Sequence, residues 1–329
     1  MLKGKRILIT GGTGSFGKKF VEMVLRDHEP ERLVVFSRDE LKQFEMNHVF
    51  SMDEHDCLRY FIGDVRDRER LYRACRGVDY IVHAAAMKQV PACEYNPTEA
   101  IKTNIYGAQN IINVAADLGV KKVVALSTDK AVSPVNLYGA TKLASDKLFV
   151  AANAFATGPK YSVVRYGNVL GSRGSVVPFF MKKRAEGVLP ITDLRMTRFW
   201  IALEEAVELV LHALDESAGG EIYVPRIPSM RITDLARVIG PDCELKEVGI
   251  RPGEKLHESL IPVEEARNTV RSKTGFIVLP DTAVLKYKGD RSGFEPVAED
   301  FHYSSDANEW WLTADEMRDV LGQQGYDVR

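Results

Sequence analysis

The sequence has few cysteines, little net charge and no long apolar run. Its four cysteines are widely spaced and form no C-x-x-C pair, and its seven histidines show no metal-ligand spacing. We therefore expect no disulfide framework and no metal site, and a reducing cytoplasm fits this pattern. A formal net charge of −2 gives no reason to expect nucleic acid or a membrane surface as partner. No apolar stretch approaches the roughly 18 residues of a membrane-spanning helix, and we expect no signal peptide.

The composition is that of a globular protein with a full core, because 45% of the 329 residues are hydrophobic and 27% are charged. Short apolar runs typical of buried parallel strands alternate with helical patterns. These runs lie at 6–10, 32–36, 59–65, 78–86, 122–126 and 161–165. The alternation predicts an α/β fold, a Rossmann-type doubly wound parallel sheet with a smaller C-terminal substrate-binding α/β domain. We place the cofactor domain at 1–166, with 196–224 returning to it, and the substrate domain and tail at 167–195 and 225–329.

A glycine-rich turn follows the first strand at once. Gly11, Gly14 and Gly17 have the spacing G-x-x-G-x-x-G, and helical periodicity runs from 18 to 26. Such glycines allow a tight turn, close approach of the backbone to a pyrophosphate, and close packing of helix on strand. The free N–H groups of the helix N-terminus then face the phosphates. The order strand, glycines, helix predicts a dinucleotide site rather than a merely structural turn.

The end of the second strand bears on the choice of cofactor. An acidic residue directly at this strand end would bind the ribose 2′-hydroxyl of NAD. Here Ser37 and Arg38 occupy the position, and Lys42 follows one turn later. A hydroxyl and a guanidinium suit a 2′-phosphate, so NADP is preferred over NAD. The alternative is a solvated helix start with Asp39 as an ordinary cap.

The third and fourth strands end in further candidate contacts. Asp64 either accepts from the adenine amino group or caps the helix that begins near Arg68. The small residues at 84–86 permit the ribose and nicotinamide to lie against the backbone. Lys88 could reach phosphate or ribose, or is a surface lysine. We interpret His83 as a packed core histidine rather than a catalyst.

Polar residues suited to a sugar nucleotide are spread along the chain. A long helix is expected from 99 to 118, and a buried Asn104 within it must satisfy its amide, either in a structural bond or at the site. The loop after the sixth strand carries one amide, Asn168, and one guanidinium, Arg173, among glycines. Such a loop suits a phosphate or a sugar.

Two later segments add basic side chains. The segment 191–200 alternates basic and apolar residues, and its Thr192 and Arg198 could hold uracil and phosphates, unless it merely closes onto the next helix. The turn at 251–255 (RPGEK) projects charge. Arg251 is suited to a bidentate contact with a diphosphate, and Glu254 could accept from ribose hydroxyls.

The fifth strand delivers Ser-Thr-Asp-Lys at 127–130, followed by Tyr138 and Lys142 in the pattern Y-x-x-x-K. On a helix this spacing places phenol and ammonium one turn apart on the same face. The ammonium would lower the tyrosine pKa, so we expect Tyr138 to act as general base, with Thr128 bonded to the same oxygen. Asp129 and Lys130 form a second acid–base pair, which indicates more than one chemical step. The alternative for this pair is a surface ion pair of little effect.

Taken together, these motifs resemble those of extended short-chain dehydrogenases/reductases, and more narrowly the inverting UDP-N-acetylglucosamine 4,6-dehydratases. The resemblance is carried by TGGTGSFG at 10–17, SRDELK at 37–42, STDK at 127–130, RYGN at 165–168, GSRGS at 171–175 and RPGEK at 251–255. Commoner nucleotide-sugar dehydratases have Asp-Glu after the threonine, where this chain has Asp129-Lys130. The inverting subfamily shares that departure.

The resemblance implies C4 oxidation, loss of water across C5/C6, hydride return to C6, and inversion at C5. It also implies UDP-N-acetylglucosamine as substrate, a tightly bound NADP regenerated in each turnover, and a cytoplasmic homo-oligomer, a dimer or hexamer. Asn168 is expected at the substrate and Val169 at the nicotinamide amide.

A UDP-sugar 4-epimerase, a C5-retaining dehydratase and a non-catalytic NADP-binding regulator remain as alternatives. The full set of expected cofactor contacts is Gly11, Thr13, Gly14, Ser15, Phe16, Gly17, Ser37, Arg38, Asp39, Lys42, Asp64, Val65, Ala84, Ala85, Lys88, Tyr138, Lys142 and Val169.

Overall fold

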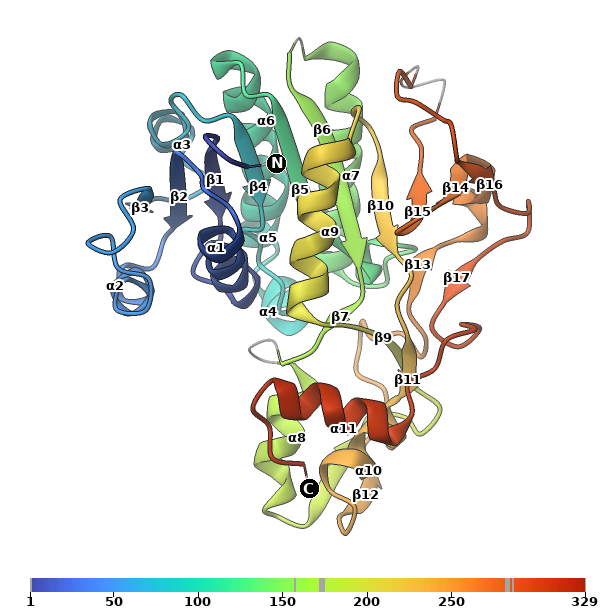
Figure 1. Cartoon of the computed structure of the whole chain (residues 1–329). Helices are drawn as coiled ribbons and strands as arrows, with labels where there is room; N and C mark the ends of the chain where they lie inside the picture. The colour runs from blue at the N-terminus through green and yellow to red at the C-terminus, as the bar shows by residue number, and fades with distance from the viewer. Residues whose placement is uncertain (1, 157, 172–174, 282–284, 286, 329) are drawn as a thin grey trace.

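The computed structural model describes residues 2–156, 158–171, 175–281, 285 and 287–328 (Figure 1). A large sheet dominates it. Its parallel strands are β1 (Arg6–Thr10), β2 (Arg32–Ser37), β3 (Leu58–Ile62), β4 (Tyr80–His83), β5 (Lys122–Thr128), β6 (Lys160–Tyr166) and β10 (Ile222–Pro225). Antiparallel strands β15 (Gly275–Val278), β14 (Thr269–Ser272) and β16 (Glu295–Pro296) continue the sheet beyond β10.

Within the described residues the strand order is β16-β14-β15-β10-β6-β5-β4-β1-β2-β3. Strand order reverses between β1 and β4, which is the place where open α/β sheets bind ligands. The central strands are almost wholly apolar and buried, as expected when helices cover both faces. The predicted doubly wound parallel sheet is therefore confirmed.

Helices cover both faces of the sheet. On one face lie α1 (Ser15–Asp27) and α9 (Leu203–Glu216), which pack on each other. On the other lie α3 (Arg68–Ala74), α6 (Gly107–Leu118) and α7 (Leu137–Phe155). Shorter helices α2 (Glu40–Asn47), α4 (Val90–Tyr95) and α5 (Pro97–Ile101) connect the strands. No helix in the described ranges has the length and apolar character needed to cross a membrane.

The helix expected from 99 to 118 is not continuous. A π-helical turn, η1 (Lys102–Tyr106), separates α5 from α6. The turn contains Asn104, whose amide bonds to the backbone of Met87 and to Thr141. The third and fourth strands are also shorter than expected, because they end at Ile62 and His83 before the backbone turns along the ligand cavity.

A second, smaller core lies beside the carboxyl edge of the sheet. Its helices are α8 (Val176–Arg184), α10 (Ile232–Ile239) and α11 (Ala314–Gln323), which Figure 1 shows grouped together near the C-terminus. The strands beside it are β7 (Asn168–Val169), β9 (Thr197–Ile201) and β11 (Ser229–Arg231) in one sheet, and β8 (Val188–Ile191) with β12 (Glu244–Glu247). The pair β13 (Ser259–Ile261) and β17 (Tyr303–Ser304) packs instead on the main core, through Leu260, Ile261 and Tyr303. Two short 3₁₀ turns, η2 (Asp129–Ala131) and η3 (Val263–Asn268), directly follow β5 and β13 in the chain.

Candidate active site

A cavity of about 500 Å³ opens at the carboxyl ends of β1, β2, β4 and β5. Its walls come from the glycine turn, the end of β2, the start of α7 and the strand β7. Most of the residues expected from sequence line it: Gly11, Thr13, Gly14, Ser15, Phe16, Gly17, Ser37, Arg38, Asp39, Lys42, Val65, Ala84, Ala85, Lys88, Thr128, Lys130, Tyr138, Lys142, Asn168 and Val169.

The glycine turn has the geometry of a phosphate site. Gly11 has φ +68°, and a Cβ there would lie 2.9 Å from the backbone of Ala84. Helix α1 begins beside it with Gly14 as N-cap and no side-chain cap, so its first N–H groups are directed at the cavity. Gly17 permits close packing, since a Cβ would lie 2.4 Å from the Gly12 carbonyl oxygen. The turn therefore fits the pyrophosphate of a dinucleotide.

The end of β2 presents one guanidinium to the cavity. The hydroxyls of Thr13 and Ser37 are 2.8 Å apart. Asp39 caps α2 by accepting from the Lys42 backbone, and its carboxylate also binds the Lys42 amine at 2.6 Å, which holds the pKa of Asp39 below its usual range. Arg38 is half exposed, and its guanidinium lies 3.6 Å from the Asp64 carboxylate. Asp39 thus acts as a cap while it also lines the cavity.

The structure corrects the interpretation of Asp64. Its carboxylate binds the Arg66 guanidinium at 2.7 Å and accepts from the Arg66 backbone. Although burial acts in the opposite direction, these bonds lower the pKa of Asp64. Asp64 is absent from the cavity lining among the described residues, and Asp67, not Asp64, caps α3. The capping role is therefore wrong. The adenine contact stays a prediction, since Gly63 and Val65 on either side of Asp64 line the cavity.

Four of the expected proton-transfer residues, Thr128, Lys130, Tyr138 and Lys142, line the cavity, whereas Asp129 is outside its described lining and contacts Thr128 and Lys130 from the protein interior. Thr128 ends β5 and donates to Asp129 Oδ1 at 2.9 Å, and the Lys130 amine donates to the same oxygen at 3.0 Å. The turn η2 places Asp129 and Lys130, and Asn136 caps α7 so that Tyr138 lies in its first turn. Asp129 is fully buried, and Oδ2 has no hydrogen-bond partner. This arrangement excludes the alternative of a surface ion pair.

Burial dominates the electrostatics of this site. It raises the pKa of Tyr138 to about 12, although Lys130 and a hydrogen bond with Thr128 act in the opposite direction. It lowers the pKa of Lys142, an effect that Asp146 partly offsets. Burial also acts to lower the pKa of Lys130, but neighbouring carboxylates outweigh it and the pKa is raised. The expectation of a lowered Tyr138 pKa is therefore wrong for this arrangement of side chains, because burial outweighs the nearby positive charge. For Lys130 the carboxylates of Asp129 and Glu258 outweigh burial and favour the charged amine.

The side chain of Asn104 forms structural hydrogen bonds. Its Oδ1 accepts from Met87 N at 2.8 Å, and its Nδ2 donates to Met87 O and to Thr141 Oγ1, both at 2.9 Å. These bonds use the amide and leave it 2% exposed, outside the cavity lining. The expectation that Asn104 binds substrate is therefore corrected.

This role gives a prediction. Replacing Asn104 by alanine should lower the free energy of unfolding by about 1–3 kcal/mol, because the Met87 backbone groups lose their partner. Urea unfolding followed by circular dichroism measures the change. Unchanged stability together with a raised KM for the sugar nucleotide would instead restore a substrate role.

The expected sugar-nucleotide residues are not gathered in one place. Asn168 lines the cavity with a buried, unpartnered Oδ1, so it is available to a ligand. Arg173 lies outside the described residues. Arg198 is buried and donates to the carbonyls of residues 197, 255 and 256, so the idea that it binds uracil or phosphate is corrected to a structural role.

The remaining two segments stand apart from the described cavity lining. Thr192 is half-buried in the turn after β8. Arg251 is exposed, and its guanidinium lies 3.9 Å from Glu254. The Gly253 carbonyl accepts from Asn136, which ties this turn to the start of α7. The contacts of these residues with a ligand stay a prediction.

Two acidic residues near the site were missed from sequence. Asp146 is buried on α7, where it accepts from Ser127 and offsets the burial of Lys142. Its spacing of i+4 from Lys142 was the available signal. Glu258 lies close to Lys130, yet it is far away in sequence. Its spacing from Lys255 is also typical of surface helices, so no local pattern indicated it.

His83 is confirmed as a core histidine. It is buried, and its Nδ1 is 2.8 Å from the Thr10 hydroxyl. Burial lowers the pKa of His83 to about 3, and Lys142 acts in the same direction. The imidazole is therefore neutral and structural.

The doubly wound sheet, the glycine turn and the Tyr138–Lys142 pair beside Thr128 define the class of short-chain dehydrogenases/reductases of the extended type. Within that class, a sequence model described as "Polysaccharide biosynthesis protein" matches residues 7–280. The chain belongs to this polysaccharide biosynthesis protein family.

Individual relatives narrow the comparison. A Campylobacter jejuni protein named UDP-N-acetylglucosamine 4,6-dehydratase (inverting) is 53% identical, over 98% of each chain. A Rickettsia akari protein named UDP-glucose 4-epimerase is 42% identical, over 80% of each chain.

Solved structures agree with the fold. Pen from Bacillus thuringiensis superposes with a TM-score of 0.90 at 36% identity, over 99% of each chain. The dTDP-glucose 4,6-dehydratase DesIV from Streptomyces venezuelae, solved with NAD, gives 0.67 at 26% identity, over 76% of this chain and 86% of that one.

Proposed function

We propose that this protein is a C5-inverting UDP-N-acetylglucosamine 4,6-dehydratase, a hydro-lyase that forms UDP-2-acetamido-2,6-dideoxy-β-L-arabino-hexos-4-ulose. The observation that carries the proposal is the buried Asp129–Lys130 pair beside Tyr138 in a dinucleotide cavity. An oxidation at C4 requires one base, whereas elimination of water requires a further base and an acid. The site has groups for all three.

The cavity fits a nicotinamide dinucleotide, and we propose NADP. The glycine turn and the N-terminus of α1 would hold the pyrophosphate, Arg38 a 2′-phosphate, and Val169 the nicotinamide end. When bound, the nicotinamide supplies the acceptor and later the donor of the hydride, so it is regenerated in each turnover.

In the proposed mechanism Tyr138 accepts the proton of the C4 hydroxyl as its phenolate. The positive charge of Lys130, together with that of the oxidised nicotinamide ring when it is bound, would favour this ionised form against the effect of burial. The resulting C4 ketone acidifies the proton on C5. Lys130 removes that proton and Asp129 protonates the departing C6 hydroxyl, which leaves as water. A proton then returns to C5 on the opposite face, with Lys130 and Tyr138 as the available donors.

The geometry supports a defined starting state for this elimination. Asp129 and Lys130 share one proton across a 3.0 Å hydrogen bond, with the amine protonated. Transfer of that proton to Asp129 gives the neutral amine and the carboxylic acid together. A closed, desolvated site favours this neutral form over two separate charges. One short proton movement therefore prepares both the base and the acid.

Proton NMR tests the function directly. The purified protein is incubated with UDP-N-acetylglucosamine in deuterated water without added reductant. We expect a new C6 methyl signal, deuterium at C5 and L-arabino couplings. A methyl signal with D-xylo couplings would retain dehydration and reject inversion. A C4 epimer without a methyl signal would instead support the epimerase, and no change would leave a dinucleotide-binding protein without this activity.

The cofactor preference gives a further prediction. Replacing Arg38 by serine should weaken NADP binding by roughly tenfold, because the 2′-phosphate loses a charge-assisted contact, and should leave NAD binding unchanged. Isothermal titration of the stripped protein with each dinucleotide measures both affinities. Equal losses for NADP and NAD would contradict a 2′-phosphate contact. The matched control is Arg26→Ser, which removes a guanidinium that binds Asp27 on α1 and should leave both affinities unchanged.

We propose that the protein works in the cytoplasm, since the four cysteines are free, as in a reducing compartment. The proposed assembly is a homo-oligomer, a dimer or hexamer. Light scattering on the purified protein distinguishes these from a monomer.

A further inference from the structure

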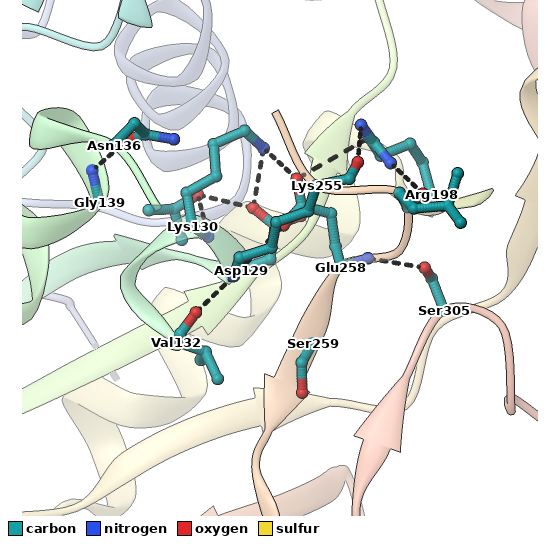
Figure 2. A network of polar contacts seen from close by, with 12 residues as sticks. Asp129, Lys130, Val132, Asn136, Gly139, Arg198, Lys255, Glu258, Ser259 and Ser305 are labelled. Carbon is teal, nitrogen blue, oxygen red and sulfur yellow. Dashed lines mark hydrogen bonds and ion pairs between the residues drawn. The ribbon is translucent and has the colours of Figure 1, made fainter. Parts of the chain in front are cut away.

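A second carboxylate, that of Glu258, lies against the Asp129–Lys130 pair. Its side chain is almost fully buried, and Oε1 is 3.5 Å from the Lys130 amine (Figure 2). The figure shows dashed lines from this amine to both carboxylates, that of Asp129 and that of Glu258. Glu258, like Asp129, is buried and outside the described lining of the cavity, so it contacts the proposed base from the protein interior.

The position of Glu258 is set by the C-terminal tail. Its backbone N–H donates to Ser305 Oγ at 3.0 Å, and its carbonyl accepts from Ser305 N at 2.8 Å. The Ser305 hydroxyl also lies 2.7 Å from Thr197 Oγ1 on β9. The bonds join three segments that are distant in sequence, so Glu258 has little freedom to move away from Lys130.

Three cations surround this carboxylate, and each of them also has another partner. Arg198 approaches Oε1 at 3.8 Å and donates to backbone carbonyls. Lys255 approaches Oε2 at 3.8 Å and donates to the Val132 carbonyl. Oε2 itself has no hydrogen-bond partner. Lys130 is the cation closest to Glu258, and an ammonium has three donors, of which Asp129 accepts one.

We propose that Glu258 is a positioning residue for Lys130: it holds the amine in line with Asp129 and determines how readily the amine gives up its proton. The inference rests on the proposed function, in which Lys130 is the base at C5. A carboxylate behind the amine stabilises the ammonium, so the shared proton stays in the pair until substrate is in place.

The charges around Lys130 agree with this role. Burial acts to lower the pKa of Lys130, but Asp129 and Glu258 together raise it, while Arg198 acts against them. Removing the charge of Glu258 should therefore lower this pKa, and the pair should lose its proton at a lower pH. The titratable and charged groups facing the amine from all neighbouring segments are Lys88, Asp129, Tyr138, Arg198, Lys255 and Glu258.

The test is the exchange Glu258→Gln, with Glu264→Gln as control. Glu264 is exposed on η3, so its exchange removes the same charge from the same part of the chain. Lysines are methylated with a ¹³C label, and the Lys130 signal is assigned by its loss in Lys130→Arg. NMR titration then gives the pKa of Lys130 without any need for turnover.

We expect the pKa of Lys130 to fall by roughly 1–3 units in Glu258→Gln and to stay unchanged in Glu264→Gln. The alkaline limb of the kcat profile should shift to lower pH by a similar amount, with KM for UDP-N-acetylglucosamine little changed. An unchanged Lys130 pKa in folded Glu258→Gln would overturn the proposal. If that variant does not fold, Glu258→Asp keeps the charge at a greater distance, and a shift of zero there would overturn it equally. Failure of the proposed function is separate, since it appears as the absence of product with the unmodified protein.

Discussion

Replacing Asp129 by asparagine is expected to lower kcat for UDP-N-acetylglucosamine dehydration by about 10²- to 10⁴-fold, the usual contribution of a positioned acid or base. Asparagine keeps an oxygen that can accept from Thr128 and Lys130, so the geometry of the turn is retained. It cannot carry the proton that the C6 hydroxyl needs in order to leave. Initial rates of product formation by anion-exchange chromatography measure the loss.

Two controls separate chemistry from folding in this experiment. Asp117→Asn, at an exposed ion pair with Arg68, should leave kcat unchanged. Dinucleotide affinity of Asp129→Asn should equal that of the unmodified protein. A decrease in kcat smaller than tenfold, with both controls as expected, would show that another group protonates the leaving hydroxyl.

Acid should destabilise the fold through His83. In the folded protein its pKa is about 3, whereas an unfolded histidine titrates near 6.5. Between these values the unfolded state binds more protons, so the free energy of unfolding falls as the pH is lowered from about 6.5 towards 3. His83 alone should contribute a loss of roughly 3 kcal/mol at pH 4.

Urea unfolding at a series of pH values tests this contribution. In His83→Gln the stability should change less steeply with pH between 6.5 and 4, because glutamine does not titrate and can still bond to Thr10. The variant should be less stable than the unmodified protein at pH 7, yet lose less on acidification. Parallel curves for the two proteins would contradict a buried neutral histidine as the cause.

Features encoded by neighbouring residues were predictable from sequence. The strand at 6–10 matches β1, because an uninterrupted apolar run between polar residues defines a buried parallel strand. The glycine turn and the Tyr138–Lys142 spacing also depend on local geometry. They place Gly11, Tyr138 and Lys142 in one cavity because the carboxyl ends of parallel strands meet at one edge of the sheet.

Features that depend on distant contacts were not predictable. Arg198 is chemically suited to phosphate, but the fold encloses its guanidinium in the carbonyls of the segment that follows residue 254. No local sequence pattern marks the π-helical turn at Asn104. The side chain of Asn104 binds the Met87 backbone, a contact with a segment outside the helix. The pKa direction of Tyr138 depends on how deeply the fold buries the phenol, and that of Lys130 depends on the carboxylates of Asp129 and Glu258, the second of which only the fold brings near.

The bonds between Ser305 and Glu258 have a consequence for the newly made protein. The glycine turn, β5 and α7 all leave the ribosome well before Ser305, so the dinucleotide cavity can form while the chain is still being synthesised. The carboxylate behind Lys130 is fixed only when the tail has been added. In a growing chain the glycine turn, Lys130 and Tyr138 are therefore synthesised before the Ser305 contacts that fix Glu258 beside Lys130.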